Sequence, residues 1–236
     1  MASSGVALRA AQFAGGAAAA GAASLACACA FGDALVHARP RAGEAHPAQA
    51  NLTRVWVVGH SGTGKTTTAR RLAEKLGALH VDLDELHWLP GWRQRPDPEM
   101  LAMLVEQLDA APAGRWVVSG NYTRIIAPWM REHTTALVWM RPGFYANQRQ
   151  LWCRTAKRWF DGGTVCNGNV ESVANILQLN IESILYYGWF YFDATEAKLQ
   201  ALANSLVAEG RIRPQDVLMP RSLAEADEVV ALCCTR

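Results

Sequence analysis

The stretch Gly59-His-Ser-Gly-Thr-Gly-Lys-Thr66 decides the fold class of this 236-residue chain. It is a complete match to the pattern G-x-x-x-x-G-K-[ST], the P-loop. A short apolar run at residues 54–58 precedes it, and residues 67–76 carry apolar side chains at helical spacing after it. Because a strand, a glycine loop and a helix in this order are the context of that motif, we predict a P-loop that binds a nucleoside triphosphate.

Each part of this loop has a predicted task. The three glycines let the main chain approach the phosphates, which its N–H groups and the positive end of the helix dipole would bind. Lys65 is predicted to contact the β- and γ-phosphates, and the hydroxyl of Thr66 to ligate Mg²⁺. The predicted ATP-binding residues are Gly59, His60, Ser61, Gly62, Thr63, Gly64, Lys65, Thr66 and Thr67.

A second predicted strand, residues 79–84, ends in the acids Asp82 and Asp84. In doubly wound sheets, ligands bind at the carboxyl ends of the strands. We assign Asp84 to catalysis and to Mg²⁺, and Asp82 to the phosphoryl acceptor. An N-cap role of Asp84 in a short helix at residues 85–88 is compatible with this function. His87 is placed at the acceptor, with a structural histidine as the alternative.

A third predicted strand, residues 115–121, has Ser119 where a Walker B strand would end in aspartate. This weakens a simple ATPase interpretation and leaves Asp82 and Asp84 as the acids of the site. Gly120 is predicted to let a ligand approach the main chain. Asn121 and Arg124 are predicted to bind the acceptor, although Arg124 could equally be a solvated arginine.

Further strands are predicted at residues 135–140 and 216–220, with helices at 97–110, 195–208 and 223–232. Strands that alternate with helices of this length favour βαβ units and a parallel sheet. The predicted fold is a three-layer α/β/α P-loop domain over residues 51–236, with a sheet of about five strands and a helical lid.

The lid is predicted at residues 143–168. Arg154 and Arg158 share a helix face and would supply cations to the transferred phosphoryl group, with Arg141 among the other bases of the segment. The glycines of Asp161-Gly-Gly163 would act as a hinge. The alternatives are a solvated basic face or a patch that contacts RNA or an acidic protein.

Residues 1–50 have a different composition, rich in Ala and Gly and poor in acids. This favours a disordered extension that serves as a plastid or mitochondrial transit peptide; a secretory signal and an extension without a targeting role are the alternatives. The sequence predicts no membrane span and an intracellular protein, cytoplasmic if the leader is not a transit peptide. The formal net charge of +2 does not indicate nucleic-acid binding.

From residue 54 to 232 the chain resembles bacterial adenylate-kinase-like proteins called topology-modulation proteins, which are similar in outline to shikimate and nucleoside monophosphate kinases. The motifs that carry the resemblance are the P-loop, Val81-Asp-Leu-Asp-Glu-Leu-His-Trp88, Pro90-Gly-Trp92, Trp116-Val-Val-Ser-Gly-Asn-Tyr122, the Arg154–Arg158 segment and Asn167-Gly-Asn169. The resemblance implies ATP, Mg²⁺, a three-layer fold and an arginine-bearing lid. Ser119 departs from the family pattern, in which an aspartate is expected.

The sequence therefore predicts a kinase that transfers the γ-phosphoryl group of ATP to a small acceptor such as a nucleotide or nucleoside. The alternative is a nucleotide-dependent switch or NTPase that binds a macromolecule such as nucleic acid. The sequence does not indicate an oligomeric state.

Overall fold

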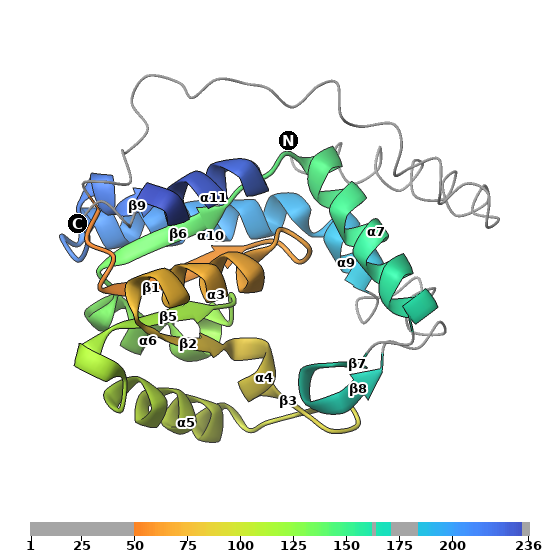
Figure 1. The fold of residues 1–236 in the computed structure, drawn as a ribbon, viewed down its shortest axis with the longest axis horizontal. Helices are drawn as coiled ribbons and strands as arrows, with labels where there is room; N and C mark the ends of the chain where they lie inside the picture. Colours follow the sequence, from red (N-terminus) through yellow and green to blue (C-terminus); the bar gives the residue numbers. More distant parts are fainter. Residues whose placement is uncertain (1–49, 162–163, 171–183, 233–236) are drawn as a thin grey trace.

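The computed structural model describes residues 50–161, 164–170 and 184–232. Its centre is a parallel sheet in the strand order β2-β5-β1-β6-β9 (Figure 1). The strands are β1 (Arg54–Gly59), β2 (Leu79–Asp82), β5 (Trp116–Ser119), β6 (Ala136–Met140) and β9 (Val217–Leu218). Because all strands run the same way, the ends of β1, β2 and β5 lie side by side at one edge, where the P-loop, Asp82 and Ser119 are found.

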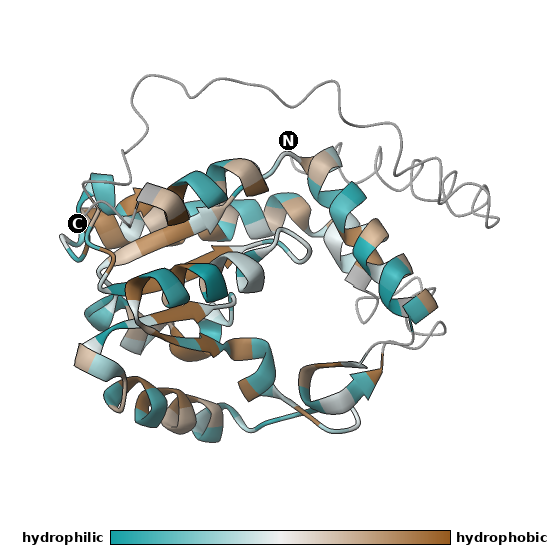
Figure 2. Cartoon of the chain, in the orientation of Figure 1, coloured by the Kyte–Doolittle hydropathy of each residue, from teal (hydrophilic) through white to brown (hydrophobic). Residues whose placement is uncertain are grey.

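Helices cover both faces of the sheet, which gives the predicted three layers. One face packs against α3 (Lys65–Leu76) and α11 (Leu223–Leu232) through side chains such as Val55, Val57 and Leu72. The other packs against α5 (Asp97–Asp109), α6 (Thr123–His133) and α10 (Phe192–Ala208) through Trp56, Val58 and their neighbours. Figure 2 shows the consequence: the strands are hydrophobic, and the exposed sides of the helices are hydrophilic.

Two insertions extend beyond the carboxyl ends of the strands (Figure 1). The first follows β2 and comprises α4 (Leu83–His87), β3 (Trp88–Leu89) and β4 (Arg93–Gln94). The second follows β6 and comprises α7 (Phe144–Asp161), the hairpin β7 (Thr164–Val165) and β8 (Asn169–Val170), and α9 (Ile184–Phe190). Short 3-10 turns lie at Pro112–Gly114, Cys166–Gly168 and Pro214–Asp216.

The helix boundaries agree closely with the sequence-based expectations, but two local predictions are wrong. The second strand ends at Asp82, whose side chain caps α4 by accepting a hydrogen bond from the Asp84 N–H group at 3.1 Å. Asp84 is therefore neither a strand residue nor the N-cap. Asn167 lies in the turn of the β7–β8 hairpin, and Asn169 begins β8.

Two predicted features lie outside the described residues. These are the leader at residues 1–49 and the glycine pair of the hinge at 162–163. Within the part of the chain that the structure describes, no helix is both long enough and apolar enough to cross a membrane.

A buried carboxylate, Asp216, joins the entrance of β9 to the segment before β1. It accepts hydrogen bonds from the Asn51 N–H at 2.8 Å and from the Arg213 guanidinium at 2.8 and 2.9 Å. Burial alone would raise the pKa of Asp216, but these donors outweigh it and lower the pKa below its ordinary value of 3.8. The charged carboxylate therefore stabilises the fold, and this stabilisation is lost as the pH falls below about 3.8.

Asp216→Asn is expected to lower the free energy of unfolding at pH 7 by about 1–3 kcal/mol, because donors to a buried charge lose their acceptor. The difference from the parent should shrink below pH 4, as the parent carboxylate becomes protonated; urea unfolding at several pH values measures it. Asp227→Asn, which breaks a surface ion pair with Arg71, is the control and should cost under about 1 kcal/mol. Equal costs for the two variants at pH 7 would contradict the prediction.

Candidate active site at the P-loop

The P-loop connects β1 to α3 in the conformation that an anion site needs. Gly59 has φ 148°, and a Cβ there would lie 2.5 Å from the carbonyl oxygen of Met140, so only glycine fits. The helix α3 begins at Lys65 with no acid in its first turn and no side-chain cap. Its first N–H groups and its dipole are thus available to phosphate oxygens, as the sequence predicts.

Lys65 points back into this loop. Its ammonium donates a hydrogen bond of 2.7 Å to the carbonyl oxygen of His60, which also accepts one from the Thr63 hydroxyl at 2.9 Å. Burial lowers the pKa of Lys65 to about 8; Asp84 opposes this shift, and the positive charge of Arg154 adds to it. An ammonium that is desolvated and next to another cation is favourably placed to bind an anion.

His60 fixes the loop to α10. Its ring stacks on Phe192 with centroids 3.9 Å apart, and its Nε2 lies 3.3 Å from a carboxylate oxygen of Glu196. Glu196 also pairs with Arg141 at 2.8 Å, and Arg141 lies over the Trp139 ring. Burial would raise the pKa of Glu196, but His60 and Arg141 outweigh it and lower the pKa. The sequence placed Arg141 among the bases of the lid. In the structure its side chain instead contacts Glu196 and Trp139, in the body of the domain.

Asn121 holds the first glycine of the loop from both sides. Its Oδ1 accepts from the Gly59 N–H at 3.1 Å, and its Nδ2 donates to the Gly59 carbonyl at 2.9 Å. The sequence placed Asn121 at the acceptor. It does line the adjacent cavity, but its amide spans the main chain of Gly59, so it also positions the P-loop.

Asn121→Ala is expected to remove both bonds, to lower the free energy of unfolding by about 1–3 kcal/mol and to weaken ATP binding. Urea unfolding and calorimetric titration measure the two effects. Asn204→Ala removes an exposed Asn amide that bonds Gln200 on α10, and it should leave both quantities nearly unchanged. A parent-like stability of Asn121→Ala would show that the clamp is dispensable.

The acids of the site have different neighbours. Asp82 accepts a hydrogen bond from the Thr66 side chain, and burial together with the charge of Asp84 raises its pKa to about 6. Asp84 accepts a hydrogen bond of 2.7 Å from the Tyr122 hydroxyl. It is also the carboxylate with the strongest effect on Lys65. Asp84 therefore bonds the tyrosine and also acts electrostatically on the P-loop lysine.

The serine at the expected Walker B position does not contact a phosphate site. Ser119 is buried, and its hydroxyl lies 3.1 Å from Nε2 of His80. In the sheet it pairs with Asp82 of the neighbouring strand β2. β5 thus has no carboxylate at this position, but the paired residue of β2, Asp82, has one.

The donors around Thr66 fit Mg²⁺. The cation prefers oxygen ligands and is usually bound by one or two carboxylates together with phosphates and water. Asp82 offers a carboxylate that bonds the Thr66 side chain, and the Asp84 N–H bonds the same carboxylate. Among the described residues no group of three or more His, Cys, Asp or Glu side chains could hold a metal ion by itself.

Gly120 has a packing role. A Cβ there would meet the Cβ of Leu83 at 2.8 Å, and its carbonyl oxygen accepts a hydrogen bond from the Trp56 indole. The close approach that this glycine allows is therefore to α4. The approach of a ligand to the main chain at Gly120 stays a prediction.

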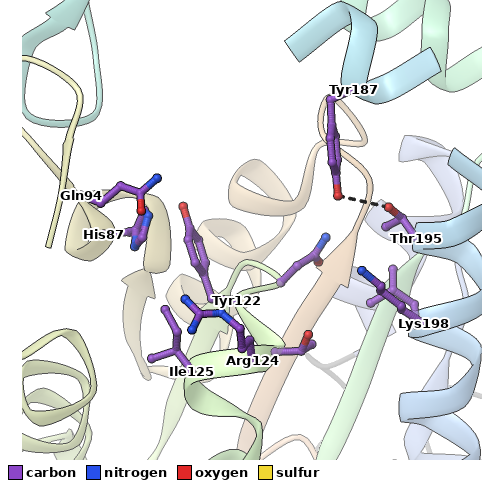
Figure 3. Close-up of a pocket in the computed structure, with 11 residues that line it drawn as sticks. His87, Gln94, Tyr122, Arg124, Ile125, Tyr187, Thr195 and Lys198 are labelled. Carbon is purple, nitrogen blue, oxygen red and sulfur yellow. Dashed lines mark hydrogen bonds between the residues drawn. The ribbon is translucent and has the colours of Figure 1, made fainter. Parts of the chain in front are cut away.

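A cavity of about 590 Å³ is lined by Tyr122, whose hydroxyl bonds Asp84 (Figure 3). His87, Gln94, Tyr122 and Arg124 line it from the side of α4 and α6, and Tyr187, Thr195 and Lys198 from α9 and α10. The volume falls within the range of small-molecule sites. His87 and Arg124, which the sequence predicted at the acceptor, both line this cavity, although His87 is also buried against Tyr122.

The turn of the β7–β8 hairpin is attached to the insertion after β2. The Asn167 amide donates to the carbonyl oxygens of Glu85 and Trp88 at 2.7 and 2.6 Å. Asn169, which is buried, accepts from the Trp92 N–H at 2.9 Å. Trp92 itself donates to the Val170 carbonyl, so its indole holds the hairpin rather than the acceptor. Sequence reasoning did not identify this attachment.

The predicted lid is mostly the helix α7. Arg154 lies close enough to Lys65 to lower its pKa, which places it near the phosphate loop. Arg158 follows one turn later on the same helix. Leu151 of α7 packs against Gly62 of the P-loop.

A family model described as an AAA domain matches residues 55–160, from β1 almost to the end of α7. The chain matches no curated protein. Among solved structures, shikimate kinase from Bacteroides thetaiotaomicron aligns with 76% of this chain and 94% of that chain, at 18% identity and a TM-score of 0.39.

The sheet order and the P-loop define the fold: the described residues form a three-layer α/β/α P-loop domain.

Proposed function

We propose that this protein is an ATP-dependent phosphotransferase that acts on a hydroxyl group of a small acceptor bound in the cavity. The observation that carries the proposal is the position of Asp84. Its carboxylate is next to the P-loop lysine on one side, and on the other it holds the hydroxyl of Tyr122, which lines the cavity. A bound acceptor would therefore lie where the P-loop presents the γ-phosphate.

The transfer follows from these neighbours. The acceptor oxygen attacks the γ-phosphorus, the bond from that phosphorus to the bridging oxygen breaks, ADP leaves, and the acceptor proton passes to Asp84. Lys65 leaves the His60 carbonyl to bind the phosphates, and Arg154 adds positive charge. Mg²⁺, when bound, would neutralise charge on the phosphates, with Thr66 and Asp82 as its nearest protein oxygens.

This assignment keeps Asp84 in catalysis but moves the magnesium role to Asp82 and the acceptor role to Asp84. The Thr66 hydroxyl bonds Asp82, which supports Asp82 on the magnesium side. Tyr122 bonds Asp84, which supports Asp84 on the acceptor side. The motifs that resemble topology-modulation proteins include both acids, and we propose that the chain is of that type.

The test combines binding and turnover. Calorimetric titration should show that ATP binds with Mg²⁺, and ADP release should depend on an added acceptor. A rate of ADP release that no acceptor raises would contradict the proposal and favour an NTPase.

A further inference from the structure

We infer that Asn167, in the turn of the β7–β8 hairpin, is a positioning residue: it holds the end of α4 and thereby keeps Asp84 in place for proton transfer. This inference rests on the proposed function, in which Asp84 is the general base, and adds a residue to it. It starts from the length of α4. A helix of five residues, Leu83–His87, is too short to be stable by itself, so its position depends on the contacts around it.

The start of α4 is held from the side of the sheet. The Asp82 carboxylate accepts the hydrogen bond from the Asp84 N–H, and the Tyr122 hydroxyl donates one to the Asp84 carboxylate. Leu83 is buried and packs against Gly120. All of these contacts lie within the first two residues of α4, so other groups must fix its far end.

The last carbonyl groups of a helix have no N–H partner within the helix and need donors from elsewhere. In α4, Arg95 of the same insertion supplies two of them. Its main-chain N–H donates to the His87 carbonyl at 2.8 Å, and its Nε donates to the Leu86 carbonyl at 2.7 Å. The carbonyls of Glu85 and of the C-cap residue Trp88 need a donor from outside this insertion.

Asn167 supplies the donors to these two carbonyls. Its Nδ2 lies 2.7 Å from the Glu85 oxygen and 2.6 Å from the Trp88 oxygen. A side-chain amide has two N–H hydrogens, one for each carbonyl. Glu85 directly follows Asp84 in the chain. A side chain from 82 residues further along therefore holds the peptide group next to the catalytic carboxylate.

The turn that carries Asn167 is fixed by Asn169. This residue is buried, its Oδ1 accepts from the Trp92 N–H at 2.9 Å, and its Nδ2 donates to the carbonyls of Leu89 and Cys166 at 3.1 and 2.7 Å. Figure 1 shows the hairpin beside β3. Asn167 itself has φ 55°, a conformation that asparagine tolerates better than most residues. Of the two asparagines in the motif, one thus anchors the turn and the other holds α4.

The turn also lies close to the acids of the site. Burial raises the pKa of the Cys166 thiol to about 11, and the negative charges of Asp84 and Asp82 add to this shift. A nearby carboxylate has this effect because it disfavours the negative thiolate. Cys166 directly precedes Asn167, so this electrostatic effect is independent evidence that the turn is a neighbour of Asp84.

Two variants remove the donors of Asn167 and leave the turn able to form. Asn167→Gly accepts the positive φ, and Asn167→Asp keeps the shape of the side chain but has no N–H donor when ionised. In the purified full-length protein, hydrogen exchange of the amides of residues 83–88 should be about 5- to 30-fold faster in both variants, the factor that one or two hydrogen bonds contribute to a local opening equilibrium. Exchange in α3 should be unchanged. Thr164→Ala, at an exposed position of the same hairpin, is the control and should exchange as the parent does.

A double-mutant cycle shows whether Asn167 acts through Asp84. ADP release from ATP and Mg²⁺ is measured without an acceptor, so that water takes the phosphoryl group, and with adenosine, AMP or shikimate. Asn167→Gly is expected to lower kcat about 10-fold, within the about 10²-fold that a misplaced group can cost, and to leave the KM for ATP within about twofold. In an Asp84→Asn background the same substitution should change kcat less than about twofold, because the side chain that it positions no longer takes a proton.

The outcomes separate this inference from the proposed function. Parent-like exchange at residues 83–88 in both variants would overturn the inference and leave the kinase proposal standing. A tenfold loss of kcat in both backgrounds would also overturn it, because Asn167 would then act independently of Asp84. Faster exchange with an unchanged kcat would reduce Asn167 to a structural contact and overturn it as well. Parent-like ADP release by Asp84→Asn would contradict the proposed function, and the inferred role in catalysis would be lost with it.

Discussion

Lys65→Ala is expected to lower kcat/KM for ATP by at least about 10²–10³-fold. The lost ammonium is the cation closest to the phosphates in the P-loop, and removing one donor to developing transition-state charge has an effect of this size. The burial of Lys65 makes the loss of kcat/KM larger, because water cannot replace the ammonium as a partner of the negative charge. Steady-state ADP release measures it, and calorimetric titration should show weaker ATP binding.

The matched control is Lys75→Ala, on the same helix but exposed in its last turn. It should retain parent activity. Both variants should melt within a few degrees of the parent, since Lys65 contributes a single hydrogen bond, to His60. Parent-like turnover of Lys65→Ala would remove the basis of the P-loop assignment.

The parts of the fold that the sequence predicted are those governed by local pattern. The P-loop and the strand and helix around it are contiguous, so one glycine motif and two periodicities predict them. The parallel direction of the strands also follows, because apolar runs that alternate with helices favour a parallel sheet with covered faces. The boundary at Asp82 was missed because a capping side chain ended the strand two residues early.

The contacts that shape the site depend on residues far apart in the sequence. Asn121 bonds Gly59 across 62 residues, and Asn169 bonds Trp92 across 77. The sequence around an asparagine does not indicate which main-chain groups its side-chain amide will bond. Glu196 is a similar case. Its position in the sequence of α10 does not distinguish it from a surface acid, and only the fold places it next to His60.

The missing Walker B acid shows that the register between neighbouring strands determines which side chains come together in a site. Ser119 was an unexplained departure in the sequence. In the sheet it pairs with Asp82, so the neighbouring strand carries the carboxylate at the same level. That Asp82 takes the place of an acid at Ser119 becomes visible only in the strand order, in which β2 lies next to β5.

Asp84→Asn is expected to lower kcat about 10²–10⁴-fold, the usual contribution of a general base. The amide keeps an oxygen that can accept the Tyr122 hydrogen bond, so the local geometry should persist while the ability to take a proton is lost. ATP affinity should change by less than about threefold, because Asp84 lies on the acceptor side of Lys65. Single-turnover ADP formation and calorimetric titration separate the two quantities.

Two further variants decide between catalysis and positioning. Asp109→Asn, at the exposed end of α5, should behave as the parent. Tyr122→Phe removes the hydroxyl but keeps the ring that packs against His87. If Asp84 acts only by holding Tyr122, Tyr122→Phe should reduce kcat as much as Asp84→Asn does. If Asp84 takes the proton, Tyr122→Phe should retain at least about tenfold more activity, because the carboxylate that performs general-base catalysis is still present.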